Sequence, residues 1–543
     1  MQSEGLFGET QASFKNLHLE DVDITITASG TVDVNVGVLA GNLLNENAVL
    51  ENCSASGEFK VIGDSPSKTV RPSGLVSWTT ITKDIKNLVN KVNITMTGTY
   101  AGTIVVAGCI CATDGNNPKM IDCQNLGNIV GNATFNGNIY ALGVAGLTGD
   151  MINCVNGSAD GNGKYGNFKL NGAFNAYLYV AGICGSKAKT RDVISNCVNY
   201  GNIEIGGTRA HKKSSYMYIS GISPSSTTDA ITDCTNYGDI TCSIVSGSGE
   251  THQFAGIGCT NSDSKLTSVK NCANYGDITI TKDASFTNTA ATVQVHGVCR
   301  VSHAVETLEN LQNNGNLSVY GSVASTLYVS GIASTISSDA TVNGTLTNTG
   351  NITVGVEATG KASVGGIFGV HETNTLTMAD GAKLVNSGKI VCNGQFVDIA
   401  QGGIFGRLAI EGAYNAVNVG DMDYIGSQVA GSSDYTVGVG GFAGISTASF
   451  SGASVYSTIL AGINSGFGFM TGSARSEAVK ATNCKVGGTL WSDYNVEDEE
   501  YKTTTIDATN YFNFIYGSGE ATDWTGTDNY DGCTLLESKP SIQ

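Results

Sequence analysis

The sequence has little proline, tryptophan or charge. Its 543 residues include 5 Pro and 3 Trp, and charged residues make up 14% of the chain. Disordered chains carry more charge and fewer large apolar residues, so the hydrophobic content of 41% predicts a folded protein with a core to bury. Positive charge is especially scarce, because 29 Lys and Arg stand against 47 Asp and Glu, for a net charge of −18. Nucleic acid and anionic lipid surfaces, which attract clustered cations, are therefore not expected partners.

Long apolar runs and a leader are missing as well. Because no apolar stretch reaches about 18 residues, we expect no transmembrane segment. Met1 leads directly into Gly5-Leu-Phe-Gly8, so we interpret the start as a fragment, and the missing signal peptide says nothing about the compartment. The 15 cysteines lack the close pairs of a zinc site, and Asp160-Gly-Asn162 completes no calcium loop. We expect no metal and no other cofactor.

Two short phrases recur along the chain. Asn196-Cys-Val-Asn-Tyr-Gly201-Asn-Ile returns with small changes at 233–240 and again at 271–278. Between the copies lies a Gly-Ile phrase, at Gly182, Gly221 and Gly256. The two phrases alternate with a period of about 37 residues, which indicates one structural unit repeated along nearly the whole chain.

The residue pattern within a unit predicts β-structure. Segments such as 216–222 and 292–298 alternate and are rich in β-branched and aromatic residues; only Asp84 to Asn93 has a helical pattern. We expect short strands ending at the Gly-Ile phrase and at the Asn-x-Gly phrase, and a third strand after that glycine. Stacked units would place like positions about 4.8 Å apart. The sequence therefore predicts an all-β, right-handed parallel β-helix of about 13 coils, over residues 1–488, with residues 489–543 as a C-terminal cap.

Asparagine and cysteine each occupy one register of the repeat. An inward Asn can bond the backbone and the Asn of the next coil, which would satisfy buried amides along the stack. The position four residues before the phrase glycine holds Cys53, Cys123 or Cys197 in early copies and Leu346 or Ala416 in later ones. Such an exchange is typical of an apolar core position. The cysteines are therefore expected to be buried and unbridged. The predicted Asn ladder comprises Asn125, Asn199, Asn236, Asn274, Asn313, Asn348, Asn386 and Asn418.

Several stretches resemble a known repeat. Gly5-Leu-Phe-Gly8, Phe14 to Ile24, Gly37-Val-Leu-Ala-Gly41 and Leu50 to Gly57 resemble GLUG-type repeats of bacterial surface proteins and adhesins, and Tyr511 to Leu536 is similar to the ends of surface lipoproteins of gut Bacteroidales. The resemblance implies an extracellular location, on the outer-membrane surface of a Gram-negative bacterium. It supplies no catalytic residues.

Two features are candidate ligand-binding sites. Tyr200, Tyr237 and Tyr275 share one register on successive coils, and alternation places them outward, either as a platform for sugar rings or as a structural aromatic ladder. Two basic loops could hold an anionic glycan, or could be merely solvated. Their residues are Lys187, Lys189, Arg191, Arg209, Lys212 and Lys213.

An enzyme is the alternative, because polysaccharide lyases and glycosidases also use β-helices. A glycosidase needs two carboxylates close together, whereas Asp is thinly spread and Asp233 replaces Asn196 at a scaffold position. A lyase needs a base and charge neutralisation, and Arg300, His303 and Glu306 form the richest titratable cluster, although a polar turn is the simpler interpretation.

We therefore predict a non-enzymatic function: a monomeric cell-surface adhesin or glycan-binding rod that makes multivalent, shallow contacts with a host or dietary glycan or a host surface protein. A polysaccharide lyase or glycoside hydrolase is the first alternative. A passive stalk that holds another domain away from the cell is the second.

Overall fold

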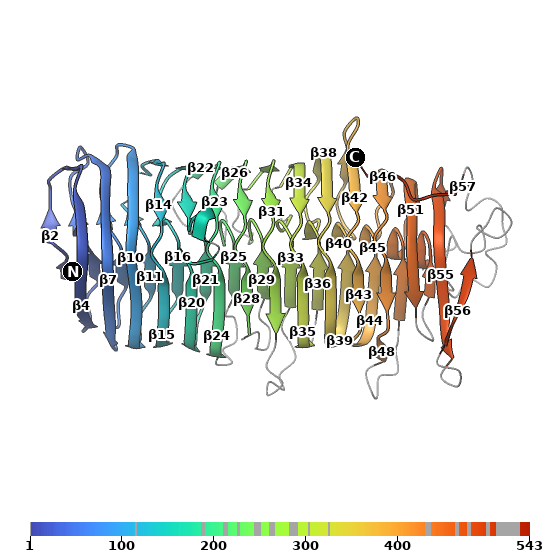
Figure 1. The fold of residues 1–543 in the computed structure, drawn as a ribbon, viewed down its shortest axis with the longest axis horizontal. Helices are drawn as coiled ribbons and strands as arrows, with labels where there is room; N and C mark the ends of the chain where they lie inside the picture. The colour runs from blue at the N-terminus through green and yellow to red at the C-terminus, as the bar shows by residue number, and fades with distance from the viewer. Residues whose placement is uncertain are drawn as a thin grey trace. The chain divides into compact units, whose positions relative to one another are not determined.

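The computed structural model confirms the predicted fold class. The chain is all-β, and its parallel strands stack as a β-solenoid of about 12 turns with a period of about 35 residues (Figure 1). The sequence thus predicted one coil too many and a slightly long period, and the right-handed sense stays a prediction. The residues that the structure describes are 2–114, 117–161, 163–185, 191–209, 216–224, 228–243, 251–259, 266–281, 292–301, 305–323, 326–428, 436–461, 466–474, 479–495, 500–505 and 533–542.

The chain divides into two compact units. Unit 1 is Met1–Ser268 with Cys272–Phe286, and unit 2 is Val269–Asn271 with Thr287–Gln543. The strand β30 (Ser268–Lys270) contributes residues to both. The described residues contain one short 3-10 helix, η1 (Ala159–Gly161), and no α-helix.

In unit 1, strands at the same position of successive turns pair in parallel. Before the Gly-Ile phrase lie β1 (Gln2–Glu4), β5 (Val34–Gly37), β8 (Val70–Ser73), β11 (Ile104–Ala107), β16 (Ile139–Leu142), β21 (Leu178–Ala181), β25 (Met217–Ser220) and β29 (Thr251–Ala255). After it lie β2 (Phe7–Thr10), β6 (Ala40–Leu43), β9 (Val76–Thr79), β12 (Ile110–Thr113) and β17 (Ala145–Leu147).

The Asn-x-Gly side of unit 1 is built the same way. Its short strands are β3 (Phe14–Lys15), β13 (Met120–Ile121), β14 (Gln124–Asn125), β18 (Met151–Ile152), β19 (Val155–Asn156), β22 (Arg191–Ser195), β23 (Val198–Asn199), β26 (Thr228–Thr232), β27 (Thr235–Asn236) and β31 (Ala273–Asn274). Strands that close the turn are β4 (His18–Ser29), β15 (Ile129–Phe135), β20 (Phe168–Phe174), β24 (Ile203–Arg209), β28 (Ile240–Cys242) and β32 (Ile278–Thr281), and β7 (Leu50–Asp64) and β10 (Ile85–Tyr100) run through both positions.

Unit 2 repeats this plan. Its strands up to the Asn-x-Gly corner are β33 (Thr292–His296), β34 (Thr307–Asn313), β36 (Thr326–Ser330), β37 (Ala333–Thr335), β38 (Ala340–Asn348), β40 (Phe368–His371), β41 (Leu376–Met378), β42 (Lys383–Asn386), β45 (Phe405–Leu408), β46 (Gly412–Asn418), β49 (Thr436–Gly440), β50 (Ala443–Ser446), β52 (Gly466–Gly468), β53 (Thr471–Ala474) and β54 (Ala481–Thr482). The remaining strands are β35 (Leu317–Val323), β39 (Ile352–Gly365), β43 (Ile390–Cys392), β44 (Gln395–Gly402), β47 (Met422–Tyr424), β48 (Ser427–Gln428), β51 (Phe450–Ala461), β55 (Lys485–Asn495), β56 (Glu500–Thr505) and β57 (Thr534–Leu535).

One local expectation is confirmed and one is wrong. A strand ends at the Gly-Ile phrase, as predicted: β11 ends at Ala107 and β12 begins at Ile110, so the phrase forms a corner between two strands. The helical pattern at Asp84 to Asn93 does not form a helix, because this segment belongs mainly to the long strand β10, which pairs with β7 over most of its length. Pairing with the neighbouring turn overrides the weak local pattern.

The asparagines of the Asn-x-Gly phrase form a continuous hydrogen-bonded column inside each unit, which we call the inner ladder. Asn199 Nδ2 donates to Asn236 Oδ1 at 2.7 Å, and Asn236 donates in turn to Asn274 at 2.8 Å. The same amide also donates to the carbonyl of the phrase glycine, as Asn199 does to Gly201 at 2.9 Å. The ladder side chains are fully buried, so these bonds satisfy amides that no water reaches. Members of the inner ladder are Asn90, Asn125, Asn156, Asn199, Asn236 and Asn274 in unit 1 and Asn313, Asn348, Asn386 and Asn418 in unit 2.

The two recurring phrases meet at this ladder. A Cβ added to Gly221 of the Gly-Ile phrase would lie 2.3 Å from Asn236 Cγ and 2.2 Å from the carbonyl oxygen of Gly256. Gly182 bears the same relation to Asn199. The absence of a side chain at this corner lets the backbone approach the buried amide, which explains why the phrases recur together.

The cysteine register is an apolar column, as predicted. Cys53 lies opposite Leu88, and Leu346, Leu384 and Ala416 continue the same register in unit 2. All 15 cysteines are buried, and no disulfide forms among the described residues, which include every cysteine. Burial raises the pKa of the Cys299 thiol to about 12, so this thiol stays protonated at neutral pH.

The residue before each cysteine turns the chain at a corner. Asn196, Asp233 and Asn271 have φ of 49°, 54° and 51°, a left-handed conformation that Asn and Asp tolerate better than other non-glycine residues. This confirms that Asp233 occupies a scaffold position. The substitution of Asp for Asn there follows from the backbone and not from carboxylate chemistry.

The C-terminal part departs from the regular stack. β55 runs across the predicted boundary at residue 488 and pairs in parallel with β51 as far as Ser492. β56 then pairs with β55 in the antiparallel sense, unlike the repeat strands. A cap over 489–543 stays a prediction, because residues 506–532 lie outside the part that the structure describes.

Substitution at the Gly-Ile corner tests the role of the ladder. We expect Gly221→Ala to lower the free energy of unfolding by about 2–3 kcal/mol, because the methyl group must displace backbone and the buried amide. Gly206→Ala is the matched control: its Cβ would meet its nearest neighbour, a side-chain oxygen of Asn171, at 3.4 Å. Urea unfolding followed by circular dichroism measures both, and equal midpoints for the two variants would contradict this account.

Thiol labelling tests the cysteine column. Native protein at pH 7 should react slowly with a soluble aromatic disulfide reagent, since every thiol is buried, and all 15 thiols should react after denaturation. Rapid labelling of the native protein, or fewer than 15 thiols in denaturant without reductant, would show that the column is open or bridged.

Candidate functional site

The tyrosine register forms an exposed stack on unit 1. The ring centroids of Tyr200 and Tyr237 are 5.0 Å apart with an interplanar angle of 3°, and those of Tyr237 and Tyr275 are 4.9 Å apart at 12°. Tyr237 and Tyr275 are 46% and 44% exposed. Partial desolvation, together with the neighbouring hydroxyl groups of Tyr200 and Tyr275, raises the pKa of Tyr237. The sequence predicted the outward direction because the inner-ladder Asn next to each Tyr points inward.

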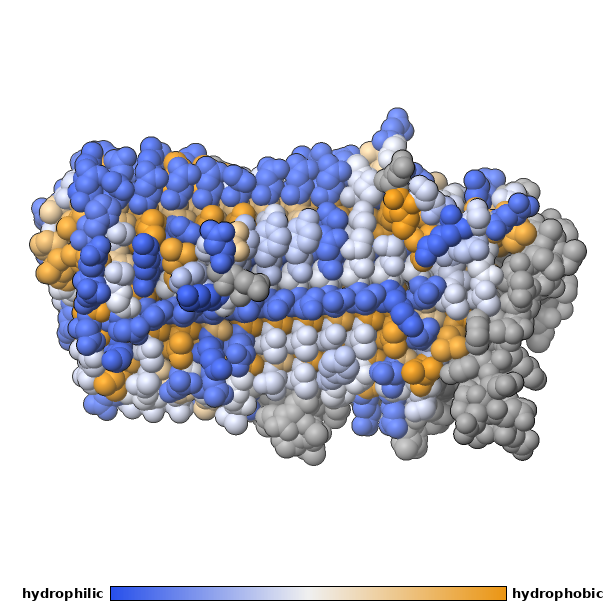
Figure 2. Space-filling view, viewed as in Figure 1, coloured by the Kyte–Doolittle hydropathy of each residue, from blue (hydrophilic) through white to orange (hydrophobic). Residues whose placement is uncertain are grey.

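A row of polar side chains, which we call the outer ladder, runs beside the tyrosines. Asn202 Oδ1 accepts the backbone N–H of Asp239 at 2.9 Å, and Asp239 Oδ1 accepts that of Asp277 at 2.8 Å. Earlier members, Asn93, Asn128 and Asn167, are linked to the next turn in the same way. Figure 2 shows hydrophilic side chains aligned in rows across successive turns, as such ladders require.

The tyrosine stack and the outer ladder line a groove of about 620 Å³. It is lined by Tyr200 and Tyr237 of the stack, by Asn202 and Asp239 of the outer ladder, and by Ser158, Ala159 and Gly163. Burial raises the pKa of Asp239, and the neighbouring carboxylate of Asp277 adds to the shift. Asp239 uses Oδ1 within the ladder, which leaves Oδ2 available to a hydroxyl group in the groove.

An insertion at the inner ladder supplies Ser158, Ala159 and Gly163 of this lining. Asn156 Nδ2 donates to the carbonyl of Gly166 at 2.8 Å, so Gly166, and not Gly157, occupies the place of the phrase glycine in this turn. The described residues between them include the 3-10 helix η1. The sequence analysis did not predict this insertion and therefore missed Ser158.

A second groove of about 540 Å³ lies on the other side of the insertion. It is lined by Lys91, Asn93, Leu126, Asn128, Ser158, Lys164 and Tyr165. Ser158 belongs to both grooves, and both follow the outer ladder. Lys164 lies over the ring of Tyr165, 5.3 Å from its centroid. Unit 1 therefore offers two shallow polar-aromatic surfaces in line with the solenoid turns.

The basic loops do not assemble as a site in the described part of the chain. Lys187, Lys189, Lys212 and Lys213 lie outside the described residues, and for Arg191 only the backbone, in β22, is described. Arg209 is 3% exposed, because it takes the register of the buried Phe174 at the end of β24. Arg209 is therefore not the exposed ligand-binding residue that we predicted.

The structure describes only two of the three enzyme candidates. Arg300 is half-buried and Glu306 is exposed, while His303 lies outside the described residues. His296, just before the Gly297 phrase, is fully buried, and its Nδ1 accepts the backbone N–H of Ser334 at 2.9 Å. Burial, with the nearby charge of Arg300, holds the pKa of His296 well below its usual range. A neutral, buried imidazole bonded to backbone is a structural group.

His371 is also built into the core. Its Nε2 lies 3.1 Å from the carbonyl oxygen of Asn374, its Nδ1 lies 3.3 Å from Tyr414 Oη, and Phe405 packs on the ring at 5.8 Å. Burial lowers the pKa of His371 to about 4. Its neighbour Glu372 pairs with Lys361 at 3.8 Å instead of with the imidazole.

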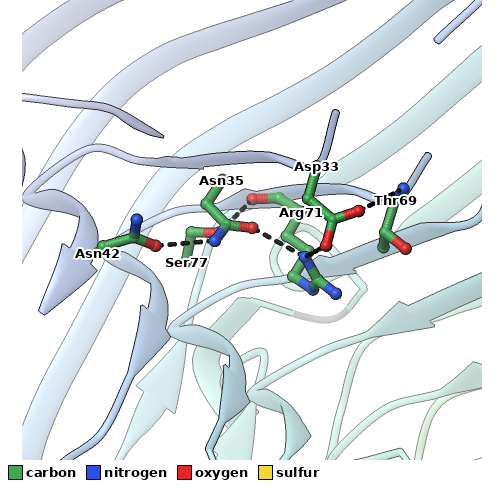
Figure 3. A network of polar contacts seen from close by, with 6 residues as sticks. All are labelled: Asp33, Asn35, Asn42, Thr69, Arg71 and Ser77. Carbon is green, nitrogen blue, oxygen red and sulfur yellow. Dashed lines mark hydrogen bonds and ion pairs between the residues drawn. The ribbon is translucent and has the colours of Figure 1, made fainter. Parts of the chain in front are cut away.

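A polar network that the sequence did not reveal lies between the Gly-Ile strands of the first turns (Figure 3). Arg71 Nη1 lies 3.3 Å from Asp33 Oδ2 and donates to Asn35 Oδ1 at 2.9 Å, and Asn35 donates to Asn42 at 2.7 Å. The guanidinium also lies over Trp78, 4.9 Å from the ring centroid. Because the protein occupies Nη1 and the face of the guanidinium, this network fastens neighbouring turns and leaves little of Arg71 for a ligand.

Comparisons with known proteins return nothing: no protein-family model, curated protein or solved structure matches the chain. In the described ranges, no helix has the length and apolar character needed to cross a membrane. Within the same ranges, no group of His, Cys, Asp and Glu side chains is arranged to hold a metal ion. The function must therefore be argued from the surface of the molecule itself.

The pH dependence of stability tests the burial of His371. Its folded pKa of about 4 lies below the ordinary value of 6.5, so between these values the unfolded chain binds a proton that the native chain does not. Stability is then fully present above pH 6.5 and falls by about 2 kcal/mol as the pH drops towards 4. Comparing urea midpoints with His371→Gln should show a smaller loss in the variant; parallel pH profiles would exclude the effect.

Proposed function

We propose that this protein is a non-enzymatic, carbohydrate-binding β-solenoid, and that the groove between the tyrosine stack and the outer ladder of unit 1 is its binding surface. The single observation that carries the proposal is the pairing of the parallel, stacked rings of Tyr200, Tyr237 and Tyr275 with an adjacent row of amides and carboxylates. Tyr237 and Tyr275 are exposed, and Tyr200 is half-buried. Sugar rings need both surfaces, because they present an apolar C–H face and an edge of hydroxyl groups.

The geometry favours an extended chain lying along the solenoid axis. Successive tyrosine rings are 4.9–5.0 Å apart, which follows the inter-strand spacing and is close to the length of one pyranose in an extended polysaccharide. Each sugar could then lie against the exposed edge of one ring and direct a hydroxyl towards Asn202 or Asp239. The contacts are shallow, so affinity would come from several sugars bound at once.

A neutral glycan fits this groove better than an acidic one. Asp239 and Asp277 of the outer ladder flank the tyrosines, and none of the residues that line the groove is cationic. An anionic sugar would face like charge there, in a protein of net charge −18. The predicted basic-loop site for an anionic glycan therefore has no counterpart in this groove.

The proposal includes an extracellular location for the protein, on the cell surface. It rests on the resemblance of the repeats to GLUG-type surface proteins and of the tail to surface lipoproteins of Bacteroidales. With multivalent shallow contacts, such a protein would act as an adhesin or as a receptor for dietary or host glycans.

Loss of the tyrosine rings should abolish glycan binding. We expect the wild-type protein to bind at least one soluble neutral polysaccharide in affinity gel electrophoresis over a panel of plant and host glycans. Tyr237→Ala with Tyr275→Ala should weaken that binding about tenfold or more, because two stacking surfaces are removed. Isothermal titration with oligosaccharides of the bound polymer gives the affinity and the length of chain that the groove holds.

Tyr320→Ala is the matched control, because Tyr320 lies in unit 2 and is 39% exposed. It should bind as the wild type does. If the wild type retards on no polysaccharide of the panel, or if Tyr320→Ala and the double variant bind alike, the proposal is wrong. Release of reducing ends or unsaturated products from a bound polymer would replace it with the enzyme alternative.

A further inference from the structure

Tyr165 belongs to the same register as the tyrosine stack. It precedes Gly166, which takes the place of the phrase glycine in its turn, just as Tyr200 precedes Gly201. A Cβ added to Gly201 would lie 2.1 Å from the carbonyl oxygen of Gly166, so the two glycines lie against each other in successive turns. Tyr165 is 37% exposed and lines the second groove, whereas Tyr200 lines the first. The tyrosine register therefore contributes a ring to both grooves.

The same register changes its chemistry in the two preceding turns. Leu126 and Lys91 each follow an inner-ladder asparagine, as the tyrosines do, and they lie in adjacent turns because Asn125 pairs with Asn90. Leu126 is half-buried and Lys91 is exposed, and both line the second groove. The second groove thus has a cation at the position that an aromatic ring holds in the first.

The second groove is cationic although the protein as a whole is acidic. Lys91 and Lys164 line it, and none of its described lining residues is Asp or Glu. Neither ammonium group forms an ion pair with a described carboxylate, and the carboxylate of Glu58 accepts a hydrogen bond from Asn93 Nδ2 at 2.8 Å instead. Lys164 lies over the ring of Tyr165, which restricts where its ammonium group can lie. In a chain of net charge −18, these two cations remain for a ligand to neutralise.

Neutral hydrogen-bond donors complete the lining. Asn128 Oδ1 accepts the backbone N–H of Asn167 at 2.9 Å, while Asn128 Nδ2 makes no hydrogen bond with the described residues. Ser158 adds a hydroxyl group. Two ammonium groups, an amide N–H and a hydroxyl are the donors that a carboxylate or sulfate group accepts from. Leu126 and Tyr165 supply the apolar surface that the ring of a sugar needs.

We propose that the second groove binds an acidic sugar residue, a uronic acid or a sulfated sugar, whose anionic group contacts Lys91 and Lys164. This inference rests on the proposed function, because it takes the ligand to be a glycan, and it narrows the class of glycan. Neutral residues lie along the tyrosine stack, acidic residues occupy the second groove, and Ser158 lines both. The preferred ligand is therefore a polysaccharide that mixes neutral and acidic residues.

Polysaccharides that differ only in charge test the inference. The first probes are a neutral polysaccharide that the wild type binds, the same polymer after partial oxidation of its primary hydroxyl groups to carboxylates, and the same polymer after light sulfation. Polygalacturonate and carrageenan are added as natural acidic polymers. Affinity gel electrophoresis should show at least one charged derivative bound about tenfold more tightly than its neutral parent, and added salt should reduce the difference. The two derivatives distinguish a carboxylate from a sulfate ligand.

Variants of the whole protein locate the anion site. Lys91→Gln with Lys164→Gln should remove the preference for the charged polymer, because both ammonium groups are lost. Lys60→Gln with Lys169→Gln is the matched control: it removes the same charge from unit 1, and neither of these lysines lines a groove. The control should keep the preference of the wild type.

Three results would overturn the inference. The first is equal affinity for a neutral polymer and its charged derivatives, which would leave the proposed function standing. The second is a preference for charged polymer that survives in the Lys91→Gln, Lys164→Gln variant, which would place the anion elsewhere on the protein. The third is that no polysaccharide, neutral or acidic, is bound, which would overturn the proposed function as well. Binding of an acidic polymer that needs both lysines, without binding of any neutral one, would support the inference and contradict the assignment of the first groove.

Discussion

Most described turns of this solenoid are closed by a buried carboxamide that bonds in two directions at once. Along the stack, Nδ2 of one asparagine meets Oδ1 of the next at 2.7 to 2.8 Å, and within the turn the same amide holds the carbonyl of the phrase glycine. Neither bond has water as a substitute, because the side chains are fully buried. The glycine of the Gly-Ile phrase, the thiol column and the left-handed corner all take positions that this ladder dictates. Register is consequently fixed turn by turn, although the spacing between successive asparagines in unit 1 varies from 31 to 43 residues.

The sequence predicted those features of the fold that follow from residue alternation within a strand and from the repeat. An inner ladder, buried cysteines and outward tyrosines all follow from which residue types recur at one register, and the structure confirms the Asn and Cys columns residue by residue. It could not predict features set by a single turn. Arg209 looked like a member of a basic loop, yet strand pairing extends to it and places it in the column of Phe174. The Arg71 network and the groove lining at Ser158 depend on residues that do not recur, so the repeat pattern does not predict them.

The candidate site follows from the alternation of side chains between the core and the surface of each strand. A position adjacent to an inward asparagine must face outward, so a tyrosine there is presented on every turn that has one. Its hydroxyl and ring do not contribute to the core, and stacking between turns holds the rings parallel at a fixed interval. The outer ladder contributes in a different way, because Asn202 and Asp239 cap backbone N–H groups with one oxygen and keep polar atoms at the surface. The scaffold and the candidate site are thus made by the same side chains.

The insertion between Gly157 and Gly166 shows how such a surface can diversify. Asn156 simply bonds the later glycine, and the strands on either side, β15 with β20 and β19 with β23, keep their register across the longer turn. Extra residues at this corner therefore cost the stack nothing in alignment, whatever their sequence. Related solenoids could exchange or lengthen these corner segments, and so change their exposed surface, while keeping the same strand register.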